Sequence, residues 1–167
     1  MVTTTYRVAS VQAEPVWLDA AGTLEKTLEL IAEAADAGAK LIAFPEVWFP
    51  GYPFFLWLDA VANQMPMVAR YHRSSLATDG PEMLAIRAAA RSHEIAVVLG
   101  FSERDRGTLY ISQTAIGADG DILFHRRKLE PTHVERSLFG EGDGSDLVVT
   151  PTSAGSAPCP ARSTSSR

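Results

Sequence analysis

The pattern of apolar and polar positions predicts a strand, a helix and a second strand in the first part of the chain. Residues 6–13 alternate polar and apolar side chains, which is typical of a strand with one buried face. Residues 19–38 predict a helix that ends near Gly38, because apolar side chains recur there at three- and four-residue spacing. That apolar stripe consists of Leu24, Leu28, Ile31 and Ala35. Residues 41–44 form a short apolar run, so the three elements indicate a parallel or mixed sheet with its helix on one face.

Further along, the pattern predicts another helix and a further set of strands. Pro81 suits the first turn of a helix, and the apolar residues after it supply a buried face. Residues 95–101 are a continuous apolar run, as in a buried strand, and residues 104–107 are predicted to form the turn after it. The Asp-Gly pair of the next loop predicts a hairpin that joins strands over 109–116 and 121–127.

The stretch of most chemical interest is residues 41–58, LIAFPEVWFPGYPFFLWL. Pro45 ends the strand, since proline cannot donate to a ladder, and Glu46 follows it directly. The sequence neighbours of this glutamate are large and apolar: Phe44, Val47, Trp48 and Phe49. A carboxylate at a strand end, walled by aromatic side chains, is expected to have a raised pKa and to act as a general base. The alternative is a solvated surface carboxylate beside a proline turn, because most glutamates are solvated.

The aromatic residues after this glutamate admit two interpretations. Residues 54–71 are predicted to be helical with an interruption at Pro66. Their first part carries four large apolar side chains: Phe54, Phe55, Trp57 and Leu58. Such side chains most often pack in a core or an interface. The other interpretation is that they wall a pocket above the glutamate, where we expect Tyr52, which directly follows the turn, and Trp48 to contact a substrate.

A second stretch, residues 124–135 (FHRRKLEPTHVE), combines basic and acidic side chains at the end of the predicted hairpin. Lys128 lies at the end of the second strand of that hairpin. A basic HRRK cluster is by itself more often a solvated edge or an anion-binding patch than a catalytic site. By the same standard, Glu135 next to Arg136 could be no more than a structural ion pair.

Taken together, the two stretches resemble the nitrilase superfamily, the carbon-nitrogen hydrolases that act through a Glu-Lys-Cys triad, and most closely its nitrilase branch. FPEVWFPGYPFFLW resembles the glutamate motif of that branch, and HRRKLEPTHVER resembles its lysine motif. The resemblance runs from about Tyr6 to about Gly155. It implies an α/β fold, the nitrilase-like α-β-β-α sandwich, of which residues 1–150 would form the N-terminal half as part of one domain.

The resemblance also implies roles for three residues and a general mode of action. Glu46 would be the general base, Lys128 the cation that stabilises the transition state, and Glu135 a second glutamate near the site. The family needs no cofactor, and its complete subunits commonly form homo-oligomers. A small nitrile is the substrate that this resemblance implies.

The nucleophile is the point at which the chain departs from the pattern. The family's cysteine follows a further strand, in an elbow like Gly-Ala-Leu-x-Cys-Trp-Glu-His, whereas Cys159 lies between two prolines with no Trp-Glu-His after it. A strand is predicted to begin at residues 147–150, but residues 151–167 contain no large apolar side chain and cannot offset their ordering entropy by burial. We expect those residues to be a low-complexity tail that is disordered or translated from a shifted reading frame.

Composition narrows the class of protein further. The chain has 167 residues, of which 46% are hydrophobic and 21% charged, as expected for one ordinary soluble domain. Its formal net charge of −5 argues against nucleic acid as the main partner. A single cysteine excludes an internal disulfide framework and suits a reducing compartment. We expect a cytoplasmic protein without a membrane partner, because the sequence opens with no leader pattern and contains no apolar run of spanning length. The histidine spacing predicts no metal site.

Two hypotheses from different classes follow. In the first, the chain is the N-terminal part of a nitrilase that converts an organic nitrile to a carboxylic acid and ammonia; cyanide-degrading and amidase relatives remain open within this hypothesis. In the second, it is a non-catalytic truncated product that at most associates with full-length subunits. We expect the chain alone to be inactive, because loss of a nucleophile removes most of the rate of a catalytic triad. We also expect an exposed apolar sheet face and poor solubility.

Overall fold

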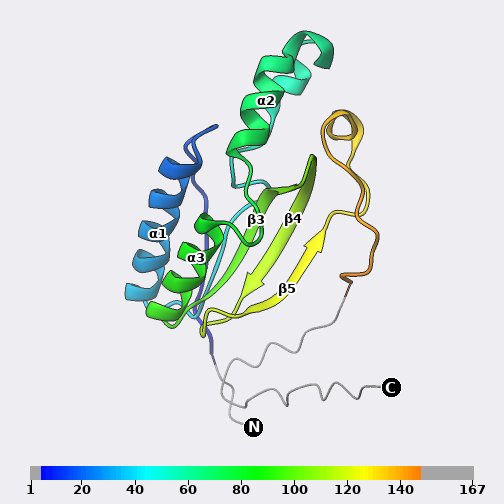
Figure 1. Ribbon diagram of the computed structural model, residues 1–167. Coiled ribbons are helices and arrows are strands. Elements are labelled where there is room, and N and C mark those ends of the chain that lie inside the picture. The colour runs from blue at the N-terminus through cyan, green and yellow to red at the C-terminus, as the bar shows by residue number, and fades with distance from the viewer. Residues whose placement is uncertain (1–4, 148–167) are drawn as a thin grey trace, which may run out of the picture.

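The computed structural model describes residues 5–147, which form one five-stranded mixed sheet with the strand order β1-β2-β3-β4-β5 (Figure 1). The strands are β1 Val8–Ser10, β2 Leu41–Ala43, β3 Ala96–Asp105, β4 Thr108–Ile116 and β5 Ile122–Arg127. β1, β2 and β3 pair in parallel, whereas β3, β4 and β5 pair antiparallel. The expected α/β class with a mixed sheet is therefore confirmed.

The helices divide into a pair that covers the sheet and a group that projects beyond it. The α-helices are α1 Ala20–Asp36, α2 Met65–Ser74 and α3 Pro81–Ser92. Three short 3₁₀ helices complete the set: η1 Phe54–Trp57, η2 Val61–Gln64 and η3 His133–Ser137. α1 and α3 lie side by side on one face of the sheet, here called the helix face, while α2 extends past the strand ends (Figure 1). Within residues 5–147, no helix is both long enough and apolar enough to cross a membrane.

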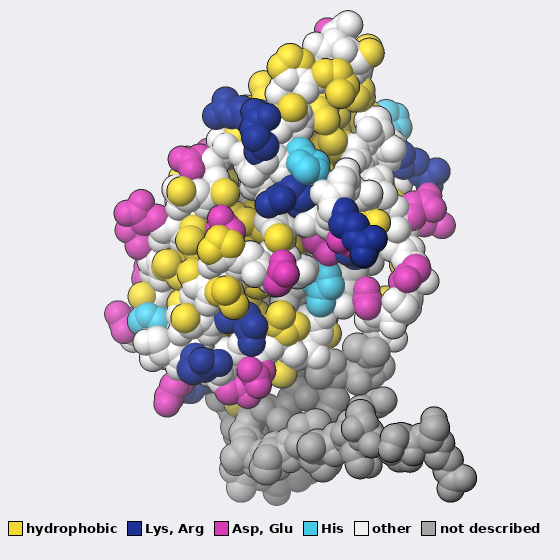
Figure 2. All heavy atoms as spheres, viewed as in Figure 1, with side chains coloured by type: hydrophobic (Ala, Val, Ile, Leu, Met, Phe, Trp, Pro, Cys, Tyr) yellow, Lys and Arg dark blue, Asp and Glu magenta, His cyan; other side chains and the backbone are white. Residues whose placement is uncertain are grey.

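The main core lies between the sheet and the helix pair. Its central side chains come from α1, α3 and the three parallel strands, and include Ile31, Ile42, Met83, Ile86, Leu99 and Phe101. A second hydrophobic cluster lies at the start of β4. It contains Leu109 and Ile111 of this strand together with Val47, Phe55, Tyr71 and Phe139. Around α2, large apolar side chains stay exposed, and Figure 2 shows hydrophobic side chains gathered at this projecting end.

Helix α1 confirms the predicted element but not its predicted buried face. Its buried residues are Thr23, Thr27, Ile31 and Ala34, so the helix is rotated by about one residue from the expected leucine stripe. The reason is tertiary: Trp48 donates its indole N–H to the hydroxyl of Thr27, which draws a polar position into the core. Gly38, with a φ of +81°, ends the helix as predicted.

Two predicted boundaries need correction. Residues 54–71 are not one interrupted helix but η1, η2 and the start of α2, and Pro66 lies in the first turn of α2, where its missing N–H is not needed. Strand β3 continues past Phe101 to Asp105, and the turn is confined to Arg106 and Gly107. The predicted apolar run underestimated β3 because its last part carries polar side chains.

Candidate active site

The position of Glu46 depends on a glycine in the neighbouring strand. After β2, the chain crosses over Gly100 of β3, and a Cβ atom at Gly100 would lie 2.5 Å from the carbonyl oxygen of Pro45 and 2.9 Å from Cα of Glu46. The chain then returns to the sheet, where the N–H of Trp48 donates to the carbonyl of Gly100 at 2.9 Å. Gly100 therefore allows the close backbone crossing that brings Glu46 against the middle strand β3.

Residues 5–147 do not form the expected aromatic wall around Glu46. The Glu46 side chain is 54% exposed, and its apolar sequence neighbours are buried in the two clusters described above. Trp48 is 1% exposed, and its indole N–H lies 2.8 Å from the Thr27 hydroxyl oxygen that accepts it. This burial argues against the predicted substrate contact by Trp48. The predicted enclosure was wrong because the chain turns at Glu46–Trp48, with a φ of +52° at Val47, so that the carboxylate is exposed while the neighbouring rings are buried.

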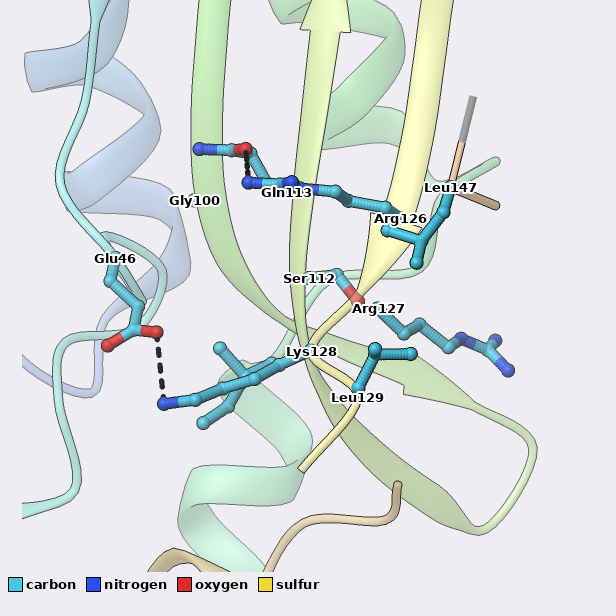
Figure 3. Close-up of a pocket in the computed structure, with 10 residues that line it drawn as sticks. Glu46, Gly100, Ser112, Gln113, Arg126, Arg127, Lys128, Leu129 and Leu147 are labelled. Carbon is cyan, nitrogen blue, oxygen red and sulfur yellow. Dashed lines mark hydrogen bonds and ion pairs between the residues drawn. The ribbon is translucent and has the colours of Figure 1, made fainter. Parts of the chain in front are cut away.

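Lys128 lies between two carboxylates. It follows β5, and its backbone N–H still donates to the carbonyl of Ile111 at 2.7 Å, so the strand geometry extends to this residue. Its Nζ lies 3.2 Å from Oε1 of Glu46 and 3.0 Å from Oε2 of Glu135; Figure 3 shows the side chain pointing toward Glu46. Partial burial lowers the pKa of Lys128, but the hydrogen bonds to Glu135 and Glu46 outweigh it and raise that pKa above its ordinary value. The ammonium form is thus stabilised.

Glu135 is held by its own helix start. Its carboxylate, 4% exposed, accepts the backbone N–H of Thr132 at 2.7 Å and the Thr132 hydroxyl at 3.0 Å, which completes a capping box at η3. Burial raises the pKa of Glu135, but hydrogen bonds from Thr132, Lys128 and Tyr52 lower it overall. The alternative of an ion pair with Arg136 is wrong, because Arg136 pairs with Glu130 at 3.7 Å.

Tyr52 joins this group of charges as the turn residue that the sequence singled out. Its hydroxyl donates to Oε1 of Glu135 at 3.1 Å, and burial together with this bond raises the pKa of Tyr52. The aromatic segment after it divides, because Phe55 is buried in the second cluster whereas Phe54 and Trp57 are exposed. The Trp57 ring stacks on His133, with the ring centres 4.8 Å apart. Core packing therefore describes Phe55, whereas a pocket-wall role for the exposed rings stays a prediction.

An open cavity of about 360 Å³ adjoins the ion pair of Glu46 and Lys128 (Figure 3). It is also lined by Gly100, Ile111, Ser112, Gln113, Arg126, Arg127, Leu129 and Leu147. Arg126 donates to the side-chain oxygen of Gln113 at 2.7 Å across this lining. Cys159, the single cysteine of the sequence, lies outside the described residues. Within residues 5–147, no group of three or more His, Cys, Asp or Glu side chains is placed to hold a metal ion.

Sequence reasoning missed two residues that position the site. Thr132 had a readable signal, since Thr132 and Glu135 have the Ser/Thr-x-x-Glu spacing of a capping box. For Gly100 the sequence signal is only that a glycine lies within a predicted strand, which is weak evidence for a close backbone approach. Together they fix the two carboxylates on either side of Lys128. The arrangement offers a half-exposed carboxylate for proton transfer and a fixed cation beside it for developing negative charge.

Comparison with known proteins agrees with this geometry. Residues 7–161 match the description of the carbon-nitrogen hydrolase family. An aliphatic nitrilase from Rhodococcus rhodochrous is 55% identical over 148 residues, which cover 88% of this chain and 40% of that protein. A bromoxynil-specific nitrilase from Klebsiella pneumoniae subsp. ozaenae is 55% identical, over 91% of this chain and 44% of its own length. A cyanide hydratase from Gibberella baccata is 49% identical, over 89% and 42% respectively. The chain thus spans about two fifths of these relatives.

Solved structures extend the likeness to the fold alone. An amidase from Nesterenkonia sp. superposes with a TM-score of 0.59 at 23% identity, over 83% of this chain and 48% of that one. A double mutant of that amidase in complex with acrylamide gives a TM-score of 0.60 at 22% identity, over 86% and 51% respectively. The described residues therefore correspond to about half of such a subunit.

Proposed function

This chain belongs to the carbon-nitrogen hydrolase family, and we propose that it supplies the Glu46, Lys128 and Glu135 side chains of a nitrilase-type active site. Residues 1–150 form the N-terminal part of the hydrolase domain in this proposal. The reaction is the hydrolysis of an organic nitrile to a carboxylic acid and ammonia. The observation that supports it best is the position of Lys128 Nζ, within 3.2 Å of Glu46 and 3.0 Å of Glu135.

The proposed chemistry divides the work among these groups. A cysteine thiolate attacks the nitrile carbon and forms a thioimidate, while Glu46 takes the thiol proton. Lys128 stabilises the negative charge that develops on the nitrile nitrogen, which then takes the proton from Glu46 and leaves that carboxylate free to act as a base again. Water activated by Glu46 adds to the thioimidate, and departure of ammonia leaves a thioester. A second water, activated in the same way, releases the carboxylic acid and restores the thiol.

Glu135 keeps the cation available through this sequence. It remains ionised, because its pKa is lowered, and it holds the ammonium form of Lys128 when Glu46 becomes protonated. The hydroxyl of Tyr52 fixes the other oxygen of Glu135 and aims the carboxylate at Lys128.

The aromatic residues near this group favour an organic nitrile over cyanide. Tyr52 borders Glu135, and its ring lies 4.9 Å from that of Phe54, whose exposed side chain offers an apolar surface. Cyanide hydration is the second candidate, supported by the 49% identity to the cyanide hydratase from Gibberella baccata. The products separate the two, because hydration stops at an amide whereas hydrolysis releases ammonia.

The test measures the release of ammonia or amide by the purified 167-residue chain from a panel of aliphatic, arylacetic and aromatic nitriles and cyanide, with Cys159→Ala beside it. The sequence context of Cys159 leads us to expect no release from the chain alone, in which case it acts at most as a partner of longer subunits. Release that Cys159→Ala abolishes would identify Cys159 as the nucleophile. Release that persists in Cys159→Ala would contradict the cysteine mechanism.

A further inference from the structure

A second cluster of charges lies on the helix face of the sheet, behind Lys128. Its centre is Glu103 of β3, whose carboxylate is 3% exposed. Glu103 accepts hydrogen bonds from Nε of Arg127 at 2.9 Å, from the Ser112 hydroxyl at 2.5 Å and from Nε2 of His125 at 3.1 Å; its other oxygen accepts Nη2 of Arg127. This carboxylate therefore joins three adjacent strands, β3, β4 and β5.

Arg127 is held from more than one side. Besides the two-bonded contact with Glu103, its Nη2 donates to Asp105 at 2.8 Å. The guanidinium carbon lies 3.8 Å from the centre of the Tyr110 ring, a cation–π contact. Planar guanidinium groups match a carboxylate in one fixed orientation, so this contact restricts direction as well as distance. The backbone of Arg127 is therefore fixed in position at the end of β5.

Strand alternation links this cluster to Lys128. Successive side chains of a strand point to opposite faces, and the backbone N–H of Lys128 still bonds as part of the ladder. Arg127 on the helix face therefore sets the direction in which Lys128 leaves the opposite face. Among residues 5–147, β5 pairs with β4 alone, and this pairing has a register irregularity near Ala115 and Ile116, so backbone pairing within the described sheet constrains β5 weakly.

We propose that Glu103 is a positioning residue for Lys128: by fixing Arg127 on the helix face, it holds the end of β5 where Lys128 Nζ lies between Glu46 and Glu135. Its importance for catalysis rests on the function proposed above, whereas its effect on Lys128 does not. Replacement of a buried ion pair by apolar side chains is often neutral or stabilising, so stability alone does not explain this arrangement. Burial raises the pKa of Glu103, but hydrogen bonds from His125, Arg127 and Ser112 lower it to about 2, which keeps the carboxylate charged.

The test is a double-mutant cycle read at the Lys128 ammonium group. The chain contains three lysines, so ¹⁵N-detected NMR titration resolves Lys128 from Lys26 and Lys40 in the intact protein. The pKa of Lys128 is measured in the unsubstituted chain, Glu46→Gln, Glu103→Gln and the double variant. A direct electrostatic effect of Glu103 changes the pKa of Lys128 by the same amount whether or not Glu46 is present. If Glu103→Gln displaces Lys128, in contrast, Lys128 loses its interaction with Glu46 and the two substitutions are no longer additive. We expect the fall in the pKa of Lys128 caused by Glu46→Gln to be at least halved in the Glu103→Gln background.

An equal fall in the two backgrounds would overturn the proposal. Asp121→Asn is the matched control, because Asp121 pairs with Arg87 at the far end of the same hairpin and should leave the cycle additive. If Glu103→Gln does not fold, Arg127→Gln replaces it, because this change removes the guanidinium through which Glu103 is proposed to act, at a side chain that is 25% exposed; an additive cycle there would equally overturn the proposal. No nitrile is used, so absence of nitrile hydrolysis would contradict the proposed function without affecting this result.

Discussion

Substitution of Gly100 by alanine tests the backbone crossing that places the glutamate. The added Cβ would lie 2.5 Å from the carbonyl oxygen of Pro45, so the two strands must separate locally by roughly half an ångström to reach even a tight contact. Because backbone atoms surround the site, no flexible side chain can move aside. Such overpacking costs about 1–3 kcal/mol, and the better strand preference of alanine returns roughly 0.5–1 kcal/mol. We expect a net loss of about 1–2 kcal/mol.

This loss should be visible in a thermal melt. For a domain of this size, 1–2 kcal/mol corresponds to a fall in Tm of about 2–8 °C. Gly107→Ala is the matched control, since a Cβ there meets nothing within 4 Å, and its Tm should stay level or rise slightly. The same Gly100→Ala protein should also show a lower pKa for Lys128, because Glu46 moves away from it. A Tm for Gly100→Ala equal to that of Gly107→Ala would refute the reasoning.

Three other predictions concern the groups around the site. Thr132→Ala should lower the free energy of unfolding by about 1 kcal/mol through loss of the cap, as measured by urea unfolding. It should also raise the pKa of Glu135 toward its ordinary value, as measured by ¹³C NMR titration. An unchanged pKa would contradict the capping-box account. The pKa of Glu103 is lower in the folded than in the unfolded chain, so its ion pair should stabilise the fold fully above about pH 4.5, and roughly 3 kcal/mol should be lost as the pH falls toward 2. Glu103→Gln should make the free energy of unfolding depend less on pH in this range. An unchanged pH dependence would assign the loss to other groups. Trp48→Phe should destabilise the chain by about 1–3 kcal/mol, because the Thr27 hydroxyl loses the indole N–H that donates to it. In a thermal melt, a Tm equal to that of the unsubstituted chain would place Trp48 outside the core.

The local pattern of residues was enough to predict those elements whose sequence signals lie within a short stretch. The strand, helix and strand of the first part follow from apolar spacing, and Gly38 and Pro81 mark their helix boundaries by backbone chemistry. The hairpin follows from its Asp-Gly turn. The grouping of Lys128 with Glu46 came from the resemblance to a family, because no spacing rule connects two residues so far apart in the chain.

The remaining features depend on partners that are distant in the sequence. Trp48 was placed beside Glu46 because they are neighbours in the chain, yet a hydroxyl on α1 draws the indole into the core. Glu103 lies between the predicted strand over 95–101 and the predicted turn over 104–107, and no role was predicted for it, because charged residues near turns are usually solvated. It is buried because Arg127, His125 and Ser112 satisfy its carboxylate, and none of these contacts is local in sequence.

The measurement that tests the central claim most directly is ammonia release by a chimera. Residues 7–147 of this chain replace the matching part of the aliphatic nitrilase from Rhodococcus rhodochrous, which is 55% identical in the matched region and supplies the rest of the subunit. We predict that the chimera hydrolyses nitriles and that Lys128→Met lowers kcat at least about a hundredfold, as removal of one charge-stabilising group does. Lys40→Met, at an exposed lysine, should leave kcat unchanged. A folded chimera in which Lys128→Met retains full kcat would contradict the assignment of this site.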